Sequence, residues 1–175
     1  MVSRIRLPVA WVMQVLVLAG VFGVVTLFEV KPEAAAFLKP FGKITASITA
    51  MVINYVGMPV SLDTISLAHP SGFRFRIVYG CTGIVPVTIV VATLLSLPLS
   101  VRQRLAGIGL GAGLILCVNL LRIVGLYYVR ANYPDSFDFV HDWMGQALMI
   151  VMTAGFLLYW ICASQHANDQ KPQLA

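Results

Sequence analysis

Long apolar runs separated by short polar segments dominate the chain, and this pattern predicts membrane-spanning helices. A helix of about 20 apolar residues crosses a hydrocarbon core of about 30 Å at roughly 1.5 Å per residue. We therefore expect an all-α integral membrane protein with one membrane domain over residues 1–175 and a cytoplasmic tail at 164–175. The predicted spans are about residues 7–28, 80–99, 105–129 and 142–163.

Residues 37–56 carry a different pattern, with apolar positions at helical spacing and polar positions on the rest of the turn. Such a stripe on a segment of modest overall hydrophobicity predicts an amphipathic helix that lies in the membrane interface. Pro40 would fit the first turn of this helix. A fifth spanning helix is the alternative for this segment.

Residues 60–79 contain two β-prone runs, 60–67 and 73–79, separated by a polar turn sequence. In the second run, the apolar Phe73, Phe75 and Ile77 alternate with other residues, as they do in a strand with one buried face. This pattern predicts a short β-hairpin on the extracytoplasmic surface.

Charge and composition fix the orientation and exclude some partners. The chain is 59% hydrophobic and 11% charged, so the lipid bilayer is its expected surroundings. The net charge of +5 comes from basic groups beside apolar runs, a pattern typical of membrane flanks rather than of a nucleic-acid-binding face. With the amino terminus inside, basic residues fall at cytoplasmic ends, as the positive-inside rule requires: Arg4, Arg6, Arg102, Arg104 and Lys171.

Cys81 lies where the predicted hairpin meets the outer end of the second span, between Gly80 and Thr82-Gly83. A cysteine in a helix also serves as a small hydrophobic residue, which is the alternative here. The flanking glycines favour a reactive thiol, because they leave room for a peptide backbone to approach. Cys117 and Cys162 lack such a setting and are expected to pack inside the protein.

Two polar residues fall on the same outer half of the predicted membrane. Arg122 is the only charge inside the third span, one turn from Asn119, and a buried membrane arginine is functional by default, although snorkelling is the alternative. His141 begins the last span beside Asp142, which would orient its ring, although a loop histidine is the alternative.

Together Cys81, Arg122 and His141 supply the groups that acyl transfer needs. The histidine takes the thiol proton and returns it to a leaving amine, and the arginine holds the developing oxyanion. No cofactor or metal is expected, because no histidine pair has the spacing of metal ligands. The glycines between residues 107 and 113 lie in an apolar span without a preceding strand, so they predict close helix packing rather than a nucleotide loop.

The motifs around these residues resemble the exosortase/archaeosortase family. The resemblance covers roughly residues 56–156, and the small size favours a compact exosortase H-type member. Thr82 stands where family members commonly have serine. The order of the motifs is also that of the family: Tyr79-Gly80-Cys81-Thr82-Gly83-Ile84, Asn119-Leu120-Leu121-Arg122 and His141-Asp142-Trp143-Met144-Gly145.

The resemblance implies a multi-pass cysteine transpeptidase of the bacterial cytoplasmic membrane, with its active site on the extracytoplasmic side. Its substrates would be secreted proteins that end in a short motif, a transmembrane helix and a basic tail. Cys81 would be the nucleophile, Arg122 the stabilising cation and His141 the acid or base, supported by Asn119 and Asp142. A small membrane transporter and a non-catalytic assembly subunit are the alternatives.

Overall fold

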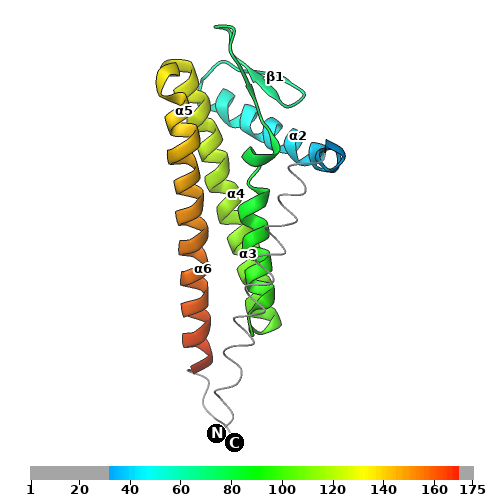
Figure 1. Cartoon of the computed structure of the whole chain (residues 1–175), viewed down its shortest axis with the longest axis vertical. Helices are drawn as coiled ribbons and strands as arrows, with labels where there is room; N and C mark the ends of the chain where they lie inside the picture. Colours follow the sequence, from blue (N-terminus) through cyan, green and yellow to red (C-terminus); the bar gives the residue numbers. More distant parts are fainter. Residues whose placement is uncertain (1–31, 170–175) are drawn as a thin grey trace, which may run out of the picture.

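The computed structural model describes residues 32–169, which fold into a mostly helical bundle with a small β-sheet at one end. Long helices run along the bundle, and another helix lies across it beneath the sheet (Figure 1). The predicted span at 7–28 lies outside the described residues. The helices of the bundle are α3 (Ile84–Ser96), α4 (Val101–Asn132) and α6 (Gly145–Asp169), and the crossing helix is α2 (Pro32–Tyr55).

Within residues 32–169, two helical segments, Val101–Asn132 and Pro134–Ser164, are long and apolar enough to cross a membrane. The helix α4 begins earlier than predicted because the Ser100 hydroxyl and the Gln103 side chain form a capping box. In contrast, α3 has only 13 residues, so the prediction of a helix over 80–99 was too long. Gly83, with φ of 76°, precedes its first turn, and Leu97 is extended before Pro98, which ends it. At the other end of the chain, α6 continues to Asp169, beyond the predicted start of the tail at 164.

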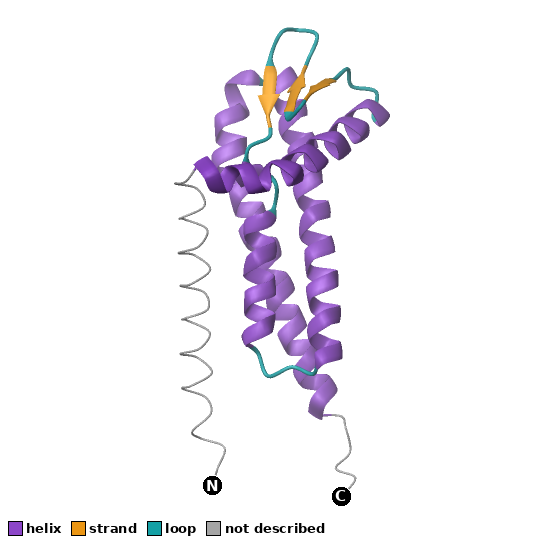
Figure 2. Cartoon of the chain, turned by 90° about the vertical axis from the view of Figure 1, so that its right-hand side faces the viewer, coloured by secondary structure: helices purple, strands orange, loops and turns teal. Residues whose placement is uncertain are grey.

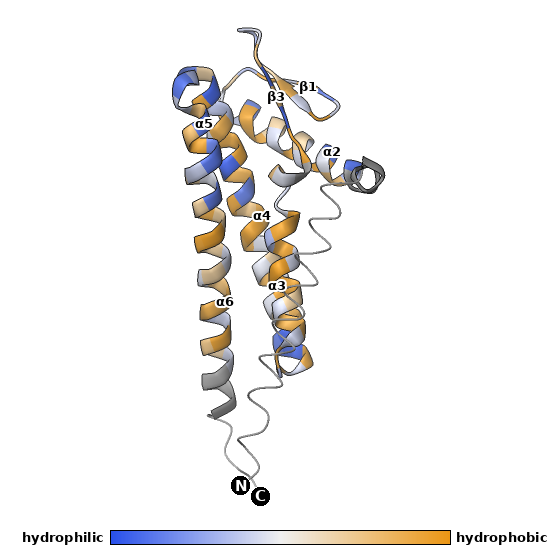
Figure 3. Cartoon of the chain, viewed as in Figure 1, coloured by the Kyte–Doolittle hydropathy of each residue, from blue (hydrophilic) through white to orange (hydrophobic). Residues whose placement is uncertain are grey.

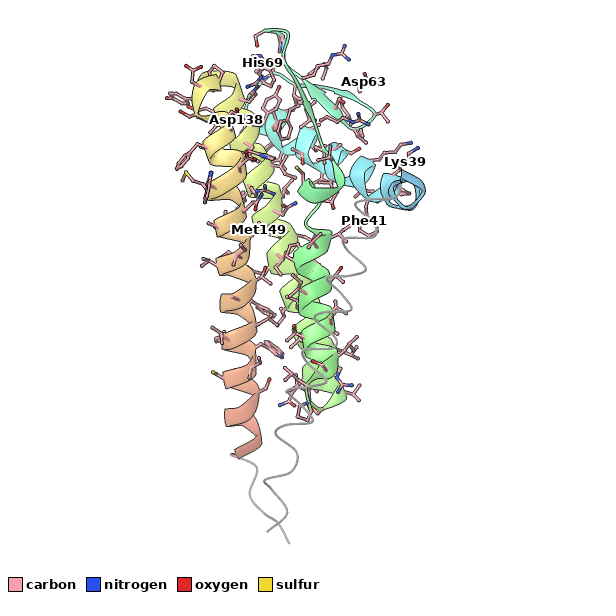
Figure 4. The ribbon with its side chains drawn as sticks, in the orientation of Figure 1. Lys39, Phe41, Asp63, His69, Asp138 and Met149 are labelled. Carbon is pink, nitrogen blue, oxygen red and sulfur yellow. The ribbon has the colours of Figure 1, made fainter. Side chains whose placement is uncertain are left out.

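The helix α2 confirms a helix in the amphipathic segment but begins at Pro32, so the placement of Pro40 in the first turn was wrong. Ala46, Ala50 and Ile53 form the buried face of α2, which packs against α4 and the sheet, whereas its other large apolar residues point outward. Phe41 and Lys39 lie at the end of α2 that projects away from the bundle (Figure 4). Interfacial placement of α2 stays a prediction, which the crosswise orientation and the outward apolar stripe support. That stripe is Phe41, Ile44, Ile48, Met51 and Tyr55.

The β-segment forms a three-stranded antiparallel sheet in the order β1-β2-β3, not a single hairpin (Figure 2). The first predicted strand is broken by a turn at Thr64, whose φ is 57°, so residues 60–67 contribute to two strands. Alternation in the second run is confirmed, because Phe75 is buried while its neighbours are exposed. The strands are β1 (Ser61–Asp63), β2 (Ser66–Ala68) and β3 (Arg74–Arg76).

The polar segment between α4 and α6 is itself helical. A 3-10 turn at Pro134–Ser136 leads into α5 (Phe137–Phe139) and a π-helical turn at Val140–Met144, which continues into α6. Hydropathy falls sharply at this end of the bundle (Figure 3). The chain therefore enters α6 through a π-helical turn, a feature often found at functional sites.

Close packing between α4 and α6 depends on two of the four glycines in the apolar stretch of α4. A Cβ at Gly107 would lie 2.5 Å from Trp160 Nε1, and a Cβ at Gly111 would overlap Phe156 Cε1. Nothing lies within 4 Å of the corresponding positions at Gly109 and Gly113. The predicted role of these glycines in helix packing is thus confirmed for one face of α4.

Replacement of Gly111 by alanine is expected to lower the thermal stability of the protein in detergent, because the new methyl group overlaps Phe156 and Val90. Overpacking of this kind typically costs about 1–3 kcal/mol. Gly109→Ala is the matched control, and its stability should stay unchanged or rise, since alanine favours helix and meets open space. Equal melting temperatures for the two variants would contradict this packing.

Candidate active site

A cavity of about 570 Å³ opens between α3, α4 and α6, and Cys81, Arg122 and His141 all contribute to its wall. The three residues come from a turn before α3, from the carboxy-terminal third of α4 and from the π-helical turn before α6. Asn119, Gly80 and Gly83 line the same cavity. The structure thus brings together residues that are separated by up to 60 positions in the sequence.

The backbone around Cys81 is held by α4. Cys81 lies in a 3-10 turn (Tyr79–Cys81), and its carbonyl oxygen accepts a 2.8 Å hydrogen bond from Nδ2 of the buried Asn119. Gly83 follows in a left-handed conformation, and a Cβ there would lie 3.1 Å from Asn119 Cγ. Gly83 therefore serves the turn and its contact with Asn119, whereas Gly80, with open space around it, lines the cavity.

The Cys81 thiol is largely buried, with 4% of the residue exposed. Burial raises the pKa of this thiol above its ordinary value, while the Arg122 guanidinium and a backbone hydrogen bond at Val78 oppose the rise. Below the raised pKa the neutral thiol predominates, so the thiolate becomes abundant only as the pH rises through it. A nucleophile in this setting needs a neighbouring base at neutral pH.

Arg122 lies further from the end of its helix than the predicted span of 105–129 indicated, because α4 ends at Asn132. The helix continues to Asn132, ten residues further, which places Arg122 about 15 Å from that end at roughly 1.5 Å per residue. Its side chain packs against Gly145 at the start of α6, where an added Cβ would lie 2.6 Å from Nε. The guanidinium is thus held between helices beside the cavity rather than directed along α4 to the helix end.

His141 is oriented by two contacts. Its Nδ1 lies 2.7 Å from Asp142 Oδ1, and its ring stacks on Phe137 with the centroids 5.6 Å apart. With Nδ1–H donating to the carboxylate, Nε2 is left as a proton acceptor. Asp142 itself does not line the cavity, so its contact with the site passes through His141.

Some functional neighbours were not singled out from the sequence. Gly145 and Phe137 position Arg122 and His141, and Gln146 adds a polar group to the cavity wall. Gly145 ends the His141-Asp142-Trp143-Met144-Gly145 motif, which was the available signal. Thr82 is buried beside Cys81 and is not part of the wall, and among the described residues no group of three potential ligands is placed to hold a metal. Cys117 and Cys162 are exposed, so the expectation that they pack inside was wrong.

The described residues form a mostly helical bundle of membrane type, in which a cysteine, an arginine and a histidine line one cavity. The model of the transmembrane exosortase family (Exosortase_EpsH) matches residues 5–160, and the chain belongs to this family. Exosortases are membrane cysteine transpeptidases that process sorting signals. Comparison with curated proteins and with solved structures gave no significant match.

Replacement of Arg122 by glutamine is expected to slow alkylation of Cys81 at pH 7–8. The guanidinium lowers the pKa of the thiol, so its loss raises that pKa further and shifts the rise in alkylation rate to higher pH. Rates of alkylation against pH, measured in a Cys117→Ser/Cys162→Ser background, test this. Arg102→Gln at the opposite end of α4 is the control, and an identical shift in both variants would contradict the electrostatic coupling.

Proposed function

We propose that this chain is a membrane cysteine peptidase and transpeptidase that processes the carboxy-terminal sorting signal of secreted proteins through a thioester on Cys81. The observation that carries the proposal is the shared cavity, whose wall includes Cys81, Arg122 and His141. Family membership supports the type of chemistry. The subtype, an exosortase H-type member, is also a proposal.

The first half of the reaction uses His141 as base and then as acid. Nε2 accepts the thiol proton, and the Cys81 sulfur forms a bond to the carbonyl carbon of the substrate. Arg122 stabilises the negative charge on the carbonyl oxygen, an interaction strengthened where water is scarce. His141 then returns the proton to the leaving amine as the carbon–nitrogen bond breaks, which leaves a thioester.

The second half transfers the acyl group. An incoming amine or water gives a proton to His141 Nε2 and attacks the thioester carbonyl, and the Cys81 thiol leaves after it regains that proton. The burial that raises the thiol pKa makes the neutral thiol the resting form at the end of the cycle. Asn119, which holds the Cys81 carbonyl, and Asp142, which holds His141, act as positioning residues.

The lining of the cavity supports a substrate that is partly embedded in the membrane. Below the three polar residues the wall is formed by apolar side chains of α3 and α6, among them Ile89 and Leu157. A membrane helix that follows the cleaved bond suits this apolar part. By the family resemblance, the substrates would be secreted proteins with a motif, a helix and a basic tail, processed on the extracytoplasmic side of a bacterial cytoplasmic membrane.

Trapping of the acyl-enzyme tests the proposal. The chain, purified from cells that secrete its substrates, is expected to carry a hydroxylamine-sensitive adduct on the Cys81 peptide, visible by mass spectrometry. Hydroxylamine treatment should remove the adduct from the wild-type protein. Without treatment, the adduct should be absent from Cys81→Ala protein and from the peptides that contain Cys117 and Cys162. Substrate processing with a Cys81 that never carries an adduct, even when turnover is slowed by cooling, would overturn the proposal.

A further inference from the structure

A second cavity of about 310 Å³ lies on the sheet side of Cys81. It shares Val78, Cys81 and His141 with the first cavity, so the two meet at the proposed nucleophile. Its remaining walls come from β3, from Arg130 in the last turn of α4 and from α5. In Figure 3, β3 runs down from the sheet toward the bundle. Nothing in the proposed reaction yet uses this space.

The edge of β3 faces this cavity. Three consecutive residues of β3, Arg74, Phe75 and Arg76, line this cavity. Successive side chains of a strand point to opposite faces, so a cavity that all three residues line lies along the backbone edge of the strand. Within the sheet, Ile77 N donates to Ile65 O and His69 N donates to Phe73 O, which places the odd-numbered residues in hydrogen-bonded pairs with β2. By the antiparallel pattern, the backbone groups of Arg74 and Arg76 point away from β2.

The charge of the second cavity favours an anion. Arg74, Arg76 and Arg130 line it together with one carboxylate, that of Asp138. Arg74 lies 3.6 Å from Asp63, with both side chains exposed, and the Arg130 guanidinium lies 5.1 Å from the centre of the Phe137 ring. Both guanidinium groups thus keep donors available, because an exposed ion pair is weak and a ring contact uses the face of the guanidinium.

Asp138 lies at the sheet end of the bundle, above Met149, which lines the first cavity (Figure 4). The apolar part of the first cavity lies on the other side of Cys81 from the sheet. If the carboxy-terminal, membrane-embedded part of a substrate occupies the apolar part, the segment before the attacked bond must leave toward β3. The second cavity is then the space that this segment meets first.

We propose that the substrate segment on the amino-terminal side of the attacked bond binds in the second cavity as an added strand on β3. The open backbone groups of Arg74 and Arg76 pair with it, and an acidic side chain of the segment is held by Arg74, Arg76 and Arg130. This inference rests on the proposed function and assigns it a substrate class, an extended acidic peptide. Strand addition of this type derives affinity from the backbone and specificity from alternate side-chain pockets.

Peptide binding to the full chain in detergent tests the charge requirement. The probes are fluorescent Val-Thr-Glu-Thr-Val and Val-Thr-Gln-Thr-Val, measured by anisotropy with Cys81→Ala protein so that no turnover occurs. The glutamate peptide is expected to bind about tenfold more tightly, since charge-assisted hydrogen bonds to arginine are the stronger kind. Arg76→Gln and Arg130→Gln should each remove most of that difference, and Arg102→Gln, outside the cavity, should retain it.

A second probe tests the strand pairing separately. In a glutamate peptide whose central amides are replaced by esters, the N–H donors are lost, and binding is expected to weaken about tenfold. The inference would be overturned if the glutamate and glutamine peptides bound equally, or if the ester analogue bound as tightly as the glutamate peptide. Displacement of the glutamate peptide by free phosphate at the same concentration would also overturn it. Peptide binding is measured without turnover, so its failure would overturn this inference and leave the acyl-enzyme test of the proposed function unaffected. Conversely, absence of the acyl-enzyme would overturn the proposed function but would not change the measured peptide binding.

Discussion

Replacement of Cys81 by alanine is expected to abolish processing of the sorting signal, with a loss on the order of 10³-fold or more, as for other covalent catalysts. No other described thiol lines either cavity, so nothing on the walls replaces the sulfur. The variant should still accumulate in the membrane, because the change removes one buried sulfur and costs about 1 kcal/mol. The loss of processing is measured on immunoblots, as the fraction of a secreted substrate that no longer carries its carboxy-terminal segment.

Cys117→Ala and Cys162→Ala are the matched controls for this experiment. Both cysteines are exposed on the outer faces of their helices, away from the cavity wall, so these variants should process substrate at the wild-type rate. Retained processing by Cys81→Ala would remove the nucleophile assignment. Such a result would favour an assembly subunit, for which the thiol has no chemical role.

Replacement of His141 by glutamine is expected to reduce processing at pH 7 by about 10²–10⁴-fold, the usual contribution of a general acid–base residue. The raised pKa of Cys81 is the reason, since the buried thiol does not ionise at this pH without a base. Activity of the variant should recover in part as the pH rises, because solvent hydroxide then generates the thiolate. The measurement is the rate of substrate cleavage in isolated membranes across pH 6–10.

Asp142→Asn separates positioning from proton transfer. The Asp142 carboxylate contacts His141 Nδ1 but does not line the cavity. The activity of Asp142→Asn should therefore fall less than that of His141→Gln, and it should not recover at high pH. A His141→Gln variant with unchanged activity at pH 7 would show that another group takes the thiol proton. That outcome would contradict the assignment of His141.

The sequence anticipated the helices better than their ends. Apolar length and periodicity were sufficient for the helical segments around α2, α4 and α6, because burial in apolar surroundings requires long uninterrupted runs. The shortness of α3 was not predictable from hydropathy, since the run 80–99 is apolar throughout much of its length. Backbone geometry set the ends instead, through the positive φ of Gly83 and the extended Leu97 before Pro98.

The sheet shows the same limit. The run 60–67 reads as one strand because its residues favour β structure, yet Thr64 adopts a left-handed conformation that few residues of its kind reach. After the turn, β2 places Leu67 in the core among residues of α2 and α4, a contact between distant parts of the chain. A local pattern does not contain that information.

For the candidate site, sequence reasoning identified the three polar residues from their position in the predicted topology. It did not supply their neighbours, because the contacts of Arg122 with Gly145 and of His141 with Phe137 arise only when α4 meets the start of α6. From the sequence, Gly83 was expected to leave room for a peptide backbone, whereas in the structure it lies close to Asn119. Roles assigned to these residues in catalysis stay predictions.

The proposed chemistry requires that the turn before α3 and the π-helical turn before α6 meet at one site in the membrane. The test uses a His141→Cys variant in which Cys117 and Cys162 are changed to serine. Intact membranes that contain this variant are treated with a short bifunctional thiol reagent. We expect an intramolecular cross-link between positions 81 and 141, and none with Val151→Cys on the exposed face of α6 in place of position 141. Separate modification of Cys81 and the cysteine at 141 without a cross-link would contradict the account.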